Sequence, residues 1–179
     1  TDAGVFYGIQ TLRKSIPATA QGMNVELPAA TINDYPRFAY RGMMLDVSRH
    51  FFPVDSVKTY LDILALHNQN TFHWHLSDDQ GWRIEIKKYP ELTQIGSKRK
   101  ETVIGHNSGT YDGKEYGGFY TQDQVRDVIN YAAERHITII PEIDMPGHQL
   151  AALATYPELG CTGGPYDVWG QWGVADDVI

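Results

Sequence analysis

Three short polar runs in the sequence could carry acid–base or metal chemistry, because each combines carboxylates with a basic or imidazole side chain. The runs are Asp46 with Arg49 and His50, Asp78 with Asp79 and Arg83, and Glu142 with Asp144 and His148. Each follows an apolar stretch typical of a buried strand, and ligands of α/β folds bind at the carboxyl ends of such strands. If the three strands are parallel neighbours, the runs converge at one rim, as titratable groups do in active sites.

Two histidines in the middle stretch, His73 and His75, suggest one chemistry, a metal centre. Alternate side chains of a strand point to opposite faces, so both imidazoles lie on one face and could bind a divalent ion with Asp78 or Asp144. Both histidines precede the end of the strand, where the interior of a barrel is packed. This position favours hydrogen-bonded core histidines instead.

A second chemistry is carboxylate-based hydrolysis of a glycosidic bond. Glu142 and Asp144 are two residues apart and therefore share one face of their strand. They could form an acid–base pair, or one of them could orient His148. The spacing leaves both alternatives open.

The elements that must position these groups alternate between strands and helices. Apolar and alternating runs predict strands over residues 40–47, from residue 70 and over residues 137–143. Pro53 opens one predicted helix, and a capping box at Thr121-Gln122-Asp123-Gln124 opens another that runs to about Arg135. The long loop follows a strand rather than a helix, which favours a β/α barrel or an open doubly wound sheet.

The remaining segments have weaker patterns. Helical spacing of apolar residues predicts an amphipathic helix from Asp2 to about Ser15. Residues 16–36 are expected to be a connector, with candidate strands near 25–27 and 30–32. The long loop, residues 77–120, is expected to hold a short strand at 82–86 and a helical turn near Pro90. A short helix is expected to end near Tyr156, before a glycine-rich tail.

Composition excludes several classes of protein. The chain has 179 residues, 42% of them hydrophobic, and a net charge of −7, which argues against binding to nucleic acid or to an anionic membrane surface. A single cysteine, Cys161, excludes an internal disulfide. No apolar run approaches a membrane span and no signal peptide is visible. Because the chain starts at Thr1, we expect a processed product or an excised piece.

Three blocks of the sequence resemble signature sequences of glycoside hydrolase family 20, the β-N-acetylhexosaminidases. The blocks are RGMMLDVSRHF at residues 41–51, HWHLSDDQ at residues 73–80 and PEIDMPGH at residues 141–148. Residues 4–12 are similar to the closing helix of the small α/β domain that precedes the barrel of this family. The resemblance extends from about Gly4 to near Ile179.

The resemblance implies an α/β fold, a partial (β/α)8 TIM-type barrel with about three of its eight strands. Residues 1–36 would be the end of the preceding small α/β domain and a connector, and residues 37–179 the N-terminal part of the barrel. It implies retaining, substrate-assisted hydrolysis of terminal N-acetylhexosamine, without cofactor or metal. The expected partners are N-acetylhexosamine glycans, and either the remainder of the barrel or a second copy at the open strand edges. The expected location is periplasmic or extracellular.

The same resemblance implies roles for four residues. Arg49 resembles the arginine that binds hydroxyls of the terminal sugar, and a planar guanidinium suits paired hydroxyls. Asp78 and His148 resemble a hydrogen-bonded chain to the catalytic glutamate, and Asp144 resembles a supporting acidic residue. The catalytic Asp-Glu pair of the family has no counterpart, since no Asp-Glu dipeptide occurs here. The chain alone is therefore expected to be inactive. The alternatives are a metal-dependent barrel hydrolase using His73 and His75, or a non-catalytic sugar-binding module.

Overall fold

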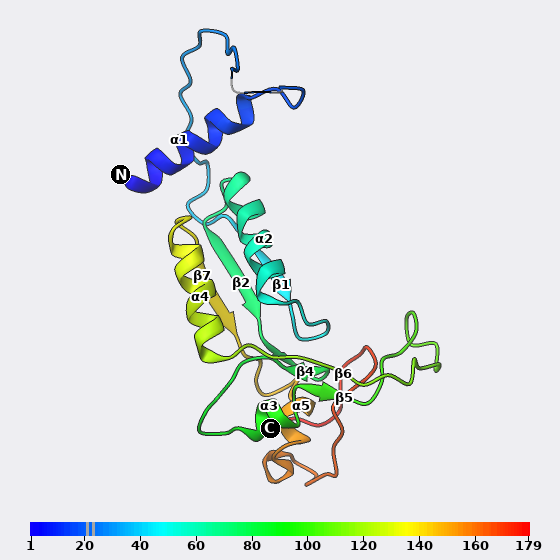
Figure 1. Cartoon of the computed structure of the whole chain (residues 1–179). Helices are drawn as coiled ribbons and strands as arrows, with labels where there is room; N and C mark the ends of the chain where they lie inside the picture. The colour runs from blue at the N-terminus through cyan, green and yellow to red at the C-terminus, as the bar shows by residue number, and fades with distance from the viewer. Residues whose placement is uncertain (21, 23) are drawn as a thin grey trace.

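The computed structural model describes residues 1–20, 22 and 24–179, and its elements alternate as the sequence predicts (Figure 1). In chain order they are α1 (Asp2–Ser15), β1 (Gly42–Asp46), α2 (Val54–Leu66), β2 (Thr71–His75), β3 (Ser77–Asp78), β4 (Gly81–Trp82), α3 (Glu91–Gln94), β5 (Lys98–Arg99), β6 (Tyr116–Gly117), α4 (Gln122–Ala133), β7 (Thr138–Glu142), α5 (Leu150–Leu153) and a 3-10 helix (Pro157–Leu159). None of the described helices is long and apolar enough to cross a membrane.

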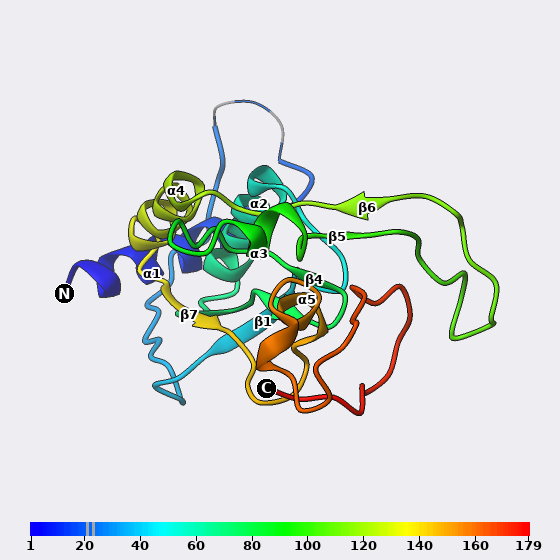
Figure 2. The ribbon, with the colours of Figure 1, turned by 90° about the horizontal axis from the view of Figure 1, so that it is seen from below.

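A parallel sheet in the order β1-β2-β7 forms the centre of the molecule. Its register pairs Asp46 with His75 and His75 with Glu142, so the last residues of the three strands form one row. Helices α2 and α4 lie side by side against one face of the sheet (Figures 1 and 2). This is a right-handed β/α arrangement of the kind that parallel strands require, with a helix in each crossover.

The core lies between the sheet and the two helices. Alternate residues of β2, Phe72 and Trp74, point to this side, and Leu76 continues the row just beyond the strand. They meet apolar side chains of the helices, among them Leu61 and Val128, all of which are buried. Burial of each such side chain stabilises the fold by about 1.5–3 kcal/mol.

The other face of the sheet is open and partly apolar. Met44 and Ile140 lie on it with 50% and 41% of their surface exposed. Within the described residues, the outer strands β1 and β7 pair only with β2. Each outer strand therefore has one edge of unpaired backbone groups, which is the feature that recruits further strands.

Both predicted helix starts are found, and one has the expected cap. The Thr121 hydroxyl accepts from the Gln124 N–H at 3.2 Å, and the Gln124 side chain accepts from the Thr121 N–H at 2.9 Å, so the capping box that opens α4 is complete. Pro53 is the N-cap of α2 and provides no side-chain cap. In α1, the Thr1 hydroxyl accepts from the Gly4 N–H at 3.2 Å.

Three sequence predictions in the irregular segments are wrong or too long. The candidate strands at 25–27 and 30–32 are absent, because no neighbouring strand among the described residues pairs with this segment. The strand expected over 82–86 is confined to Gly81–Trp82, which pairs with β3, and to a single bridge between Ile84 and Tyr120. Beyond Trp82 the chain leaves its partner strand, so the ladder ends.

The segment between β2 and α4 covers the carboxyl end of the sheet. It contains β3, β4, α3, β5 and β6, and Figure 1 shows these short elements gathered below the arrowheads of β2 and β7 with the C-terminus. Its longest loop, between β5 and β6, extends away from the sheet in Figure 2. The carboxyl strand ends are therefore lined by loops, which is the usual site of function in parallel β/α folds.

Candidate functional site

The buried carboxylate of Asp78 is the centre of a polar cluster at the carboxyl ends of β1, β2 and β7. Its Oδ2 lies 2.6 Å from Nη1 of Arg49 and 2.8 Å from Nε2 of His75. Its Oδ1 accepts from the backbone N–H of Asp79 at 2.7 Å and lies 3.2 Å from Nδ1 of His148. Asp78 is 0% exposed, so these contacts supply the stabilisation that water would otherwise give a carboxylate.

Arg49 is held in place by the turn that follows β1. Asp46 Oδ1 accepts from the backbone N–H groups of Ser48 and Arg49, at 2.9 and 3.0 Å, which closes the turn. The guanidinium then reaches Asp46 Oδ2 at 3.1 Å through Nη1 and Gln80 Oε1 at 3.1 Å through Nε. The Arg49 side chain remains 24% exposed beside the buried carboxylate of Asp78.

His148 lies between two adjacent aspartates. Its Nδ1 is 3.1 Å from Asp79 Oδ2 and 3.2 Å from Asp78 Oδ1. Asp79 is itself anchored, because its Oδ1 accepts from the Leu150 N–H at 3.1 Å. His148 has a left-handed backbone with φ of +57°, a conformation that is uncommon outside glycine and concentrates at functional sites.

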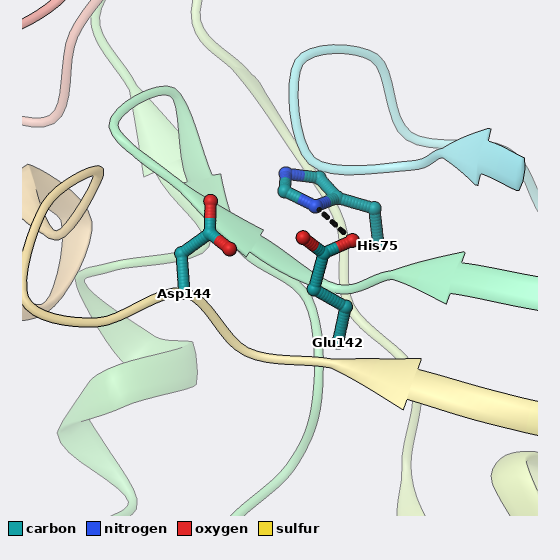
Figure 3. Close-up of side chains that lie close together, drawn as sticks. All are labelled: His75, Glu142 and Asp144. Carbon is teal, nitrogen blue, oxygen red and sulfur yellow. Dashed lines mark ion pairs between the residues drawn. The ribbon is translucent and has the colours of Figure 1, made fainter.

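Asp144 belongs to a second group, with His75 and Glu142, on the β7 side of the cluster (Figure 3). Its backbone N–H donates to the Ser77 hydroxyl at 3.2 Å. Burial and a hydrogen bond with Glu142 raise the pKa of Asp144. Burial also acts to raise the pKa of Glu142, but hydrogen bonds from His75 and Asp144 outweigh it and lower that pKa. The hydrogen bond between the two carboxyl groups therefore shifts their pKa values in opposite directions, up for Asp144 and down for Glu142.

The two histidines of β2 both face Glu142. His73 Nε2 and His75 Nδ1 lie 2.5 and 2.8 Å from the same oxygen, Glu142 Oε2. Their common face is the one that strand alternation predicts. Glu142 contacts both imidazoles. Of the two carboxylates that the sequence suggested, Asp78 contacts His75, and Asp144 lies in one group with His75 and Glu142.

Two residues of the predicted clusters lie outside the site. His50 stacks on the Tyr116 ring with centroids 5.1 Å apart, and burial, together with the charge of Arg99, lowers the pKa of His50. Arg83 is fully buried and donates to backbone carbonyls of the surrounding loops, including Ser48 O at 2.7 Å and Ser97 O at 2.7 Å. Arg83 therefore organises the loops and does not face a ligand.

Sequence reasoning missed two partners that the fold supplies. Asp79 approaches His148 as closely as Asp78 does, and Glu142 joins His73 to His75. The Asp-Asp pair was visible, but strand alternation would send its two side chains to opposite faces. The pair converges on His148 because the chain turns after β3, and spacing does not report that turn.

A further hollow lies at the amino-terminal end of the sheet, away from these charges. Its volume is about 560 Å³, and its lining includes Tyr7 of α1, Tyr35 of the connector and Arg41. The chemistry-bearing side chains therefore do not gather at this cavity. They gather at the opposite, carboxyl end of the strands.

The fold and the site place the chain among β/α folds whose functional groups lie at the carboxyl ends of parallel strands. The chain belongs to glycosyl hydrolase family 20: the model of the family's catalytic domain matches residues 38–179. The match to the family model does not test the boundary between the connector and the barrel. That boundary, expected at residues 36–37 from the resemblance, stays a prediction.

Characterised relatives agree in sequence and in structure. A beta-hexosaminidase of Porphyromonas gingivalis is 51% identical over 180 residues, covering 98% of this chain and 22% of that protein. The solved GH20 beta-N-acetylhexosaminidase of Streptomyces coelicolor superposes with a TM-score of 0.85 at 44% identity, over 98% of this chain and 34% of that one. A mutant Streptomyces plicatus beta-hexosaminidase, solved in complex with its product GlcNAc, superposes with a TM-score of 0.86 at 43% identity. The match covers 100% of this chain and 35% of that one. The chain thus spans about a quarter to a third of these relatives.

Proposed function

We propose that the complete protein, meaning these residues together with the rest of the family domain, removes terminal N-acetylhexosamine residues from glycans. The reaction is retaining and substrate-assisted, so the acetamido oxygen of the substrate is the nucleophile and a glutamate is the acid/base. The single observation that carries this proposal is the link through Asp78, which contacts Arg49 on one side and His148 on the other. That link joins a sugar-binding group to an acid–base chain.

The geometry of Arg49 supports sugar binding. Its Nε and Nη1 are occupied by Gln80, Asp46 and Asp78. Within residues 1–20, 22 and 24–179, its Nη2 makes no hydrogen bond, although its two N–H groups lie in a rigid plane with the others. Two donors in a fixed plane can bind two oxygens of a sugar. The neighbouring carboxylates keep the guanidinium oriented before the sugar arrives, which lowers the cost of binding.

Asp78 and His148 act through the acid/base and not on the sugar. An imidazole held by one or two carboxylates through Nδ1 presents Nε2 to a further group, and here that group is the catalytic glutamate. The contacts of Asp78 and Asp79 with Nδ1 fix the orientation of the imidazole and so aim Nε2 at the group that it contacts. Burial and a hydrogen bond with Glu142 raise the pKa of Asp144, which supports the polar cluster from the β7 side.

The proposal also covers what the 179 residues lack. They correspond to about three of eight barrel strands, with residues 1–36 as the end of the preceding domain and the connector. They contain no Asp-Glu dipeptide, so the acid/base and the residue that orients the acetamido group come from other strands. The open edges of β1 and β7 are where the remaining strands pair, or where two copies associate.

Hydrolysis of a chromogenic N-acetylglucosaminide tests the proposal. The complete protein should turn over, and a sample shown by mass spectrometry to contain only these 179 residues should not, since acid/base catalysis contributes about 10²–10⁴-fold. Turnover by the 179 residues alone would contradict the proposed role of the missing pair. Glycan binding without turnover by the complete protein would instead favour a sugar-binding module, and a stoichiometric bound metal would favour a metal-dependent hydrolase.

Arg49→Lys in the complete protein tests the sugar-binding assignment. An ammonium group cannot reproduce the planar donors, so most of kcat/KM should be lost while circular dichroism stays native. The matched control is Arg126→Lys on the exposed face of α4, where Arg126 pairs only with Asp123. Activity of Arg49→Lys within a few-fold of the wild type would make Arg49 a structural ion-pair residue.

A further inference from the structure

His75 bridges the two halves of the polar cluster. It is the last residue of β2 and is 4% exposed. Its Nδ1 lies 2.8 Å from Glu142 Oε2, and its Nε2 lies 2.8 Å from Asp78 Oδ2. Figure 3 shows the first of these contacts, with Asp144 on the segment that follows β7. The strand register explains the bridge, because it places His75 directly beside Glu142.

These two distances fix the protonation of the ring. An ionised carboxylate only accepts hydrogen bonds, so a nitrogen 2.8 Å from a carboxylate oxygen must carry a proton. A neutral imidazole has one N–H, and its bare nitrogen would direct a lone pair at a carboxylate. The alternative, in which Nε2 accepts from Arg49 Nη1 at 3.2 Å, leaves that lone pair facing Asp78. The ring therefore carries both protons and a positive charge.

The groups around His75 favour this charge from every side. Asp46 faces it from β1, Asp78 from β3 and Glu142 from β7, while Arg49 is a fixed cation 3.2 Å from its Nε2. Burial alone would disfavour the charged ring, but hydrogen bonds to Asp78 and Glu142 outweigh burial and raise the pKa of His75 to about 9. His73, on the same face, contacts Glu142, and Asp144 lies close to both Glu142 and His75 from the segment after β7.

We propose that His75 is a positioning residue for the reaction, because its doubly protonated ring fixes Asp78 toward His148 and fixes Glu142 toward Asp144. This inference rests on the proposed function and deepens it. His75 touches neither the sugar nor the acid/base. Its two N–H groups occupy Asp78 Oδ2 and Glu142 Oε2. Asp78 therefore directs its other oxygen, Oδ1, at the Asp79 N–H and at His148. One buried cation thereby sets the direction of two carboxyl groups that come from different strands.

His75→Gln in the complete protein removes the charge and one of the two N–H contacts. Losing a hydrogen bond between charged groups corresponds to a fall in kcat of about tenfold to a hundredfold. KM should change by less than about threefold, since His75 does not contact the sugar. Arg49→Lys should differ by raising KM. His67→Gln is the matched control, because His67 is exposed at the end of α2, and it should leave kcat and KM unchanged.

Nitrogen NMR of the histidine side chains reads the protonation of His75 independently of activity. Both ring nitrogens should be protonated at neutral pH, with deprotonation near pH 9. Glu142→Gln removes one acceptor and its charge, so the same ring should deprotonate at a lower pH in that variant. This second variant keeps the test decisive if His75→Gln does not fold.

The outcomes are distinct. A single protonated nitrogen on His75 at neutral pH, or a titration that does not move in Glu142→Gln, would overturn the proposal. So would unchanged kcat in a folded His75→Gln variant. A wild-type protein without turnover would overturn the proposed function, and the positioning role with it, whatever the NMR shows. A lowered kcat at constant KM, with a doubly protonated ring, is the result that supports it.

Discussion

Arg83→Lys in the complete protein tests whether one buried guanidinium holds together the loops around the site. Arg83 is 0% exposed and its guanidinium reaches five backbone carbonyls in four parts of the chain. The acceptors are Val47 O and Ser48 O after β1, Gln80 O between β3 and β4, and Ser97 O and Gly118 O beside β5 and β6. Burial, and then repulsion from Arg99, lower the pKa of Arg83 to about 10, so it stays charged at neutral pH.

The magnitude follows from a count of donors. A guanidinium has five N–H groups and an ammonium has three, so at least two of the five carbonyl oxygens lose their donor in Arg83→Lys. Each buried acceptor left unsatisfied costs about 1–3 kcal/mol, so the loss in the free energy of unfolding reaches about 2–6 kcal/mol when two oxygens lose their last donor. Ser97 O and Gln80 O would keep a donor, since they also accept from the Gly118 N–H and from Arg99. Such a loss is a large part of the total stability of a domain, about 5–15 kcal/mol.

Equilibrium unfolding in denaturant measures the loss, and hydrogen exchange locates it. Residues 96–118 should exchange faster in the variant, because Ser97 and Gly118 lie in the segment that Arg83 anchors. Arg126→Lys is the control: Arg126 is 61% exposed, and its replacement should stay within about 0.5 kcal/mol of the wild type. If Arg83→Lys costs no more than this control, the loops are held by other contacts and the reasoning fails.

Three further predictions concern pH, assembly and capping. The pKa of His75 in the folded protein is raised from 6.5 to about 9, so the stability that this shift contributes is complete below pH 6.5 and is lost as the pH rises through 9. The difference in unfolding free energy between wild type and His75→Gln should therefore shrink by about 3 kcal/mol over that range. A difference that does not depend on pH would contradict the raised pKa. The 179-residue chain should self-associate through β1, β7 and the open face with Met44 and Ile140, whereas a monodisperse 20 kDa monomer in sedimentation equilibrium would refute this. Thr121→Ala should cost about 1 kcal/mol in denaturant unfolding, and Thr121→Ser should restore most of it; equal stability of the two variants would mean that the capping box contributes nothing.

Local patterns in the sequence predicted the strands β1, β2 and β7, the helices α2 and α4, and the buried face of β2. The apolar alternation of β2 directs Phe72 and Trp74 to the core and the two histidines to the opposite face, and the capping box marks the start of α4. These features depend on residues within one or two turns or on strand geometry alone, so a single sequence is sufficient. The three signature blocks likewise indicated the family that the comparison with known proteins establishes.

The pairing of the charged groups was decided by the tertiary structure. The bridge from Asp78 through His75 to Glu142 depends on the register of β2 with β7, and the contact of Asp79 with His148 depends on the turn after β3. The sequence grouped Arg83 with Asp78 and Asp79 because they are close along the chain. In the fold, Arg83 points away from the site, because its side chain binds carbonyls about 15 to 35 residues away. A sequence specifies local conformation through neighbours along the chain. The energy of an ion pair depends on distance and burial, and only the folded chain sets those.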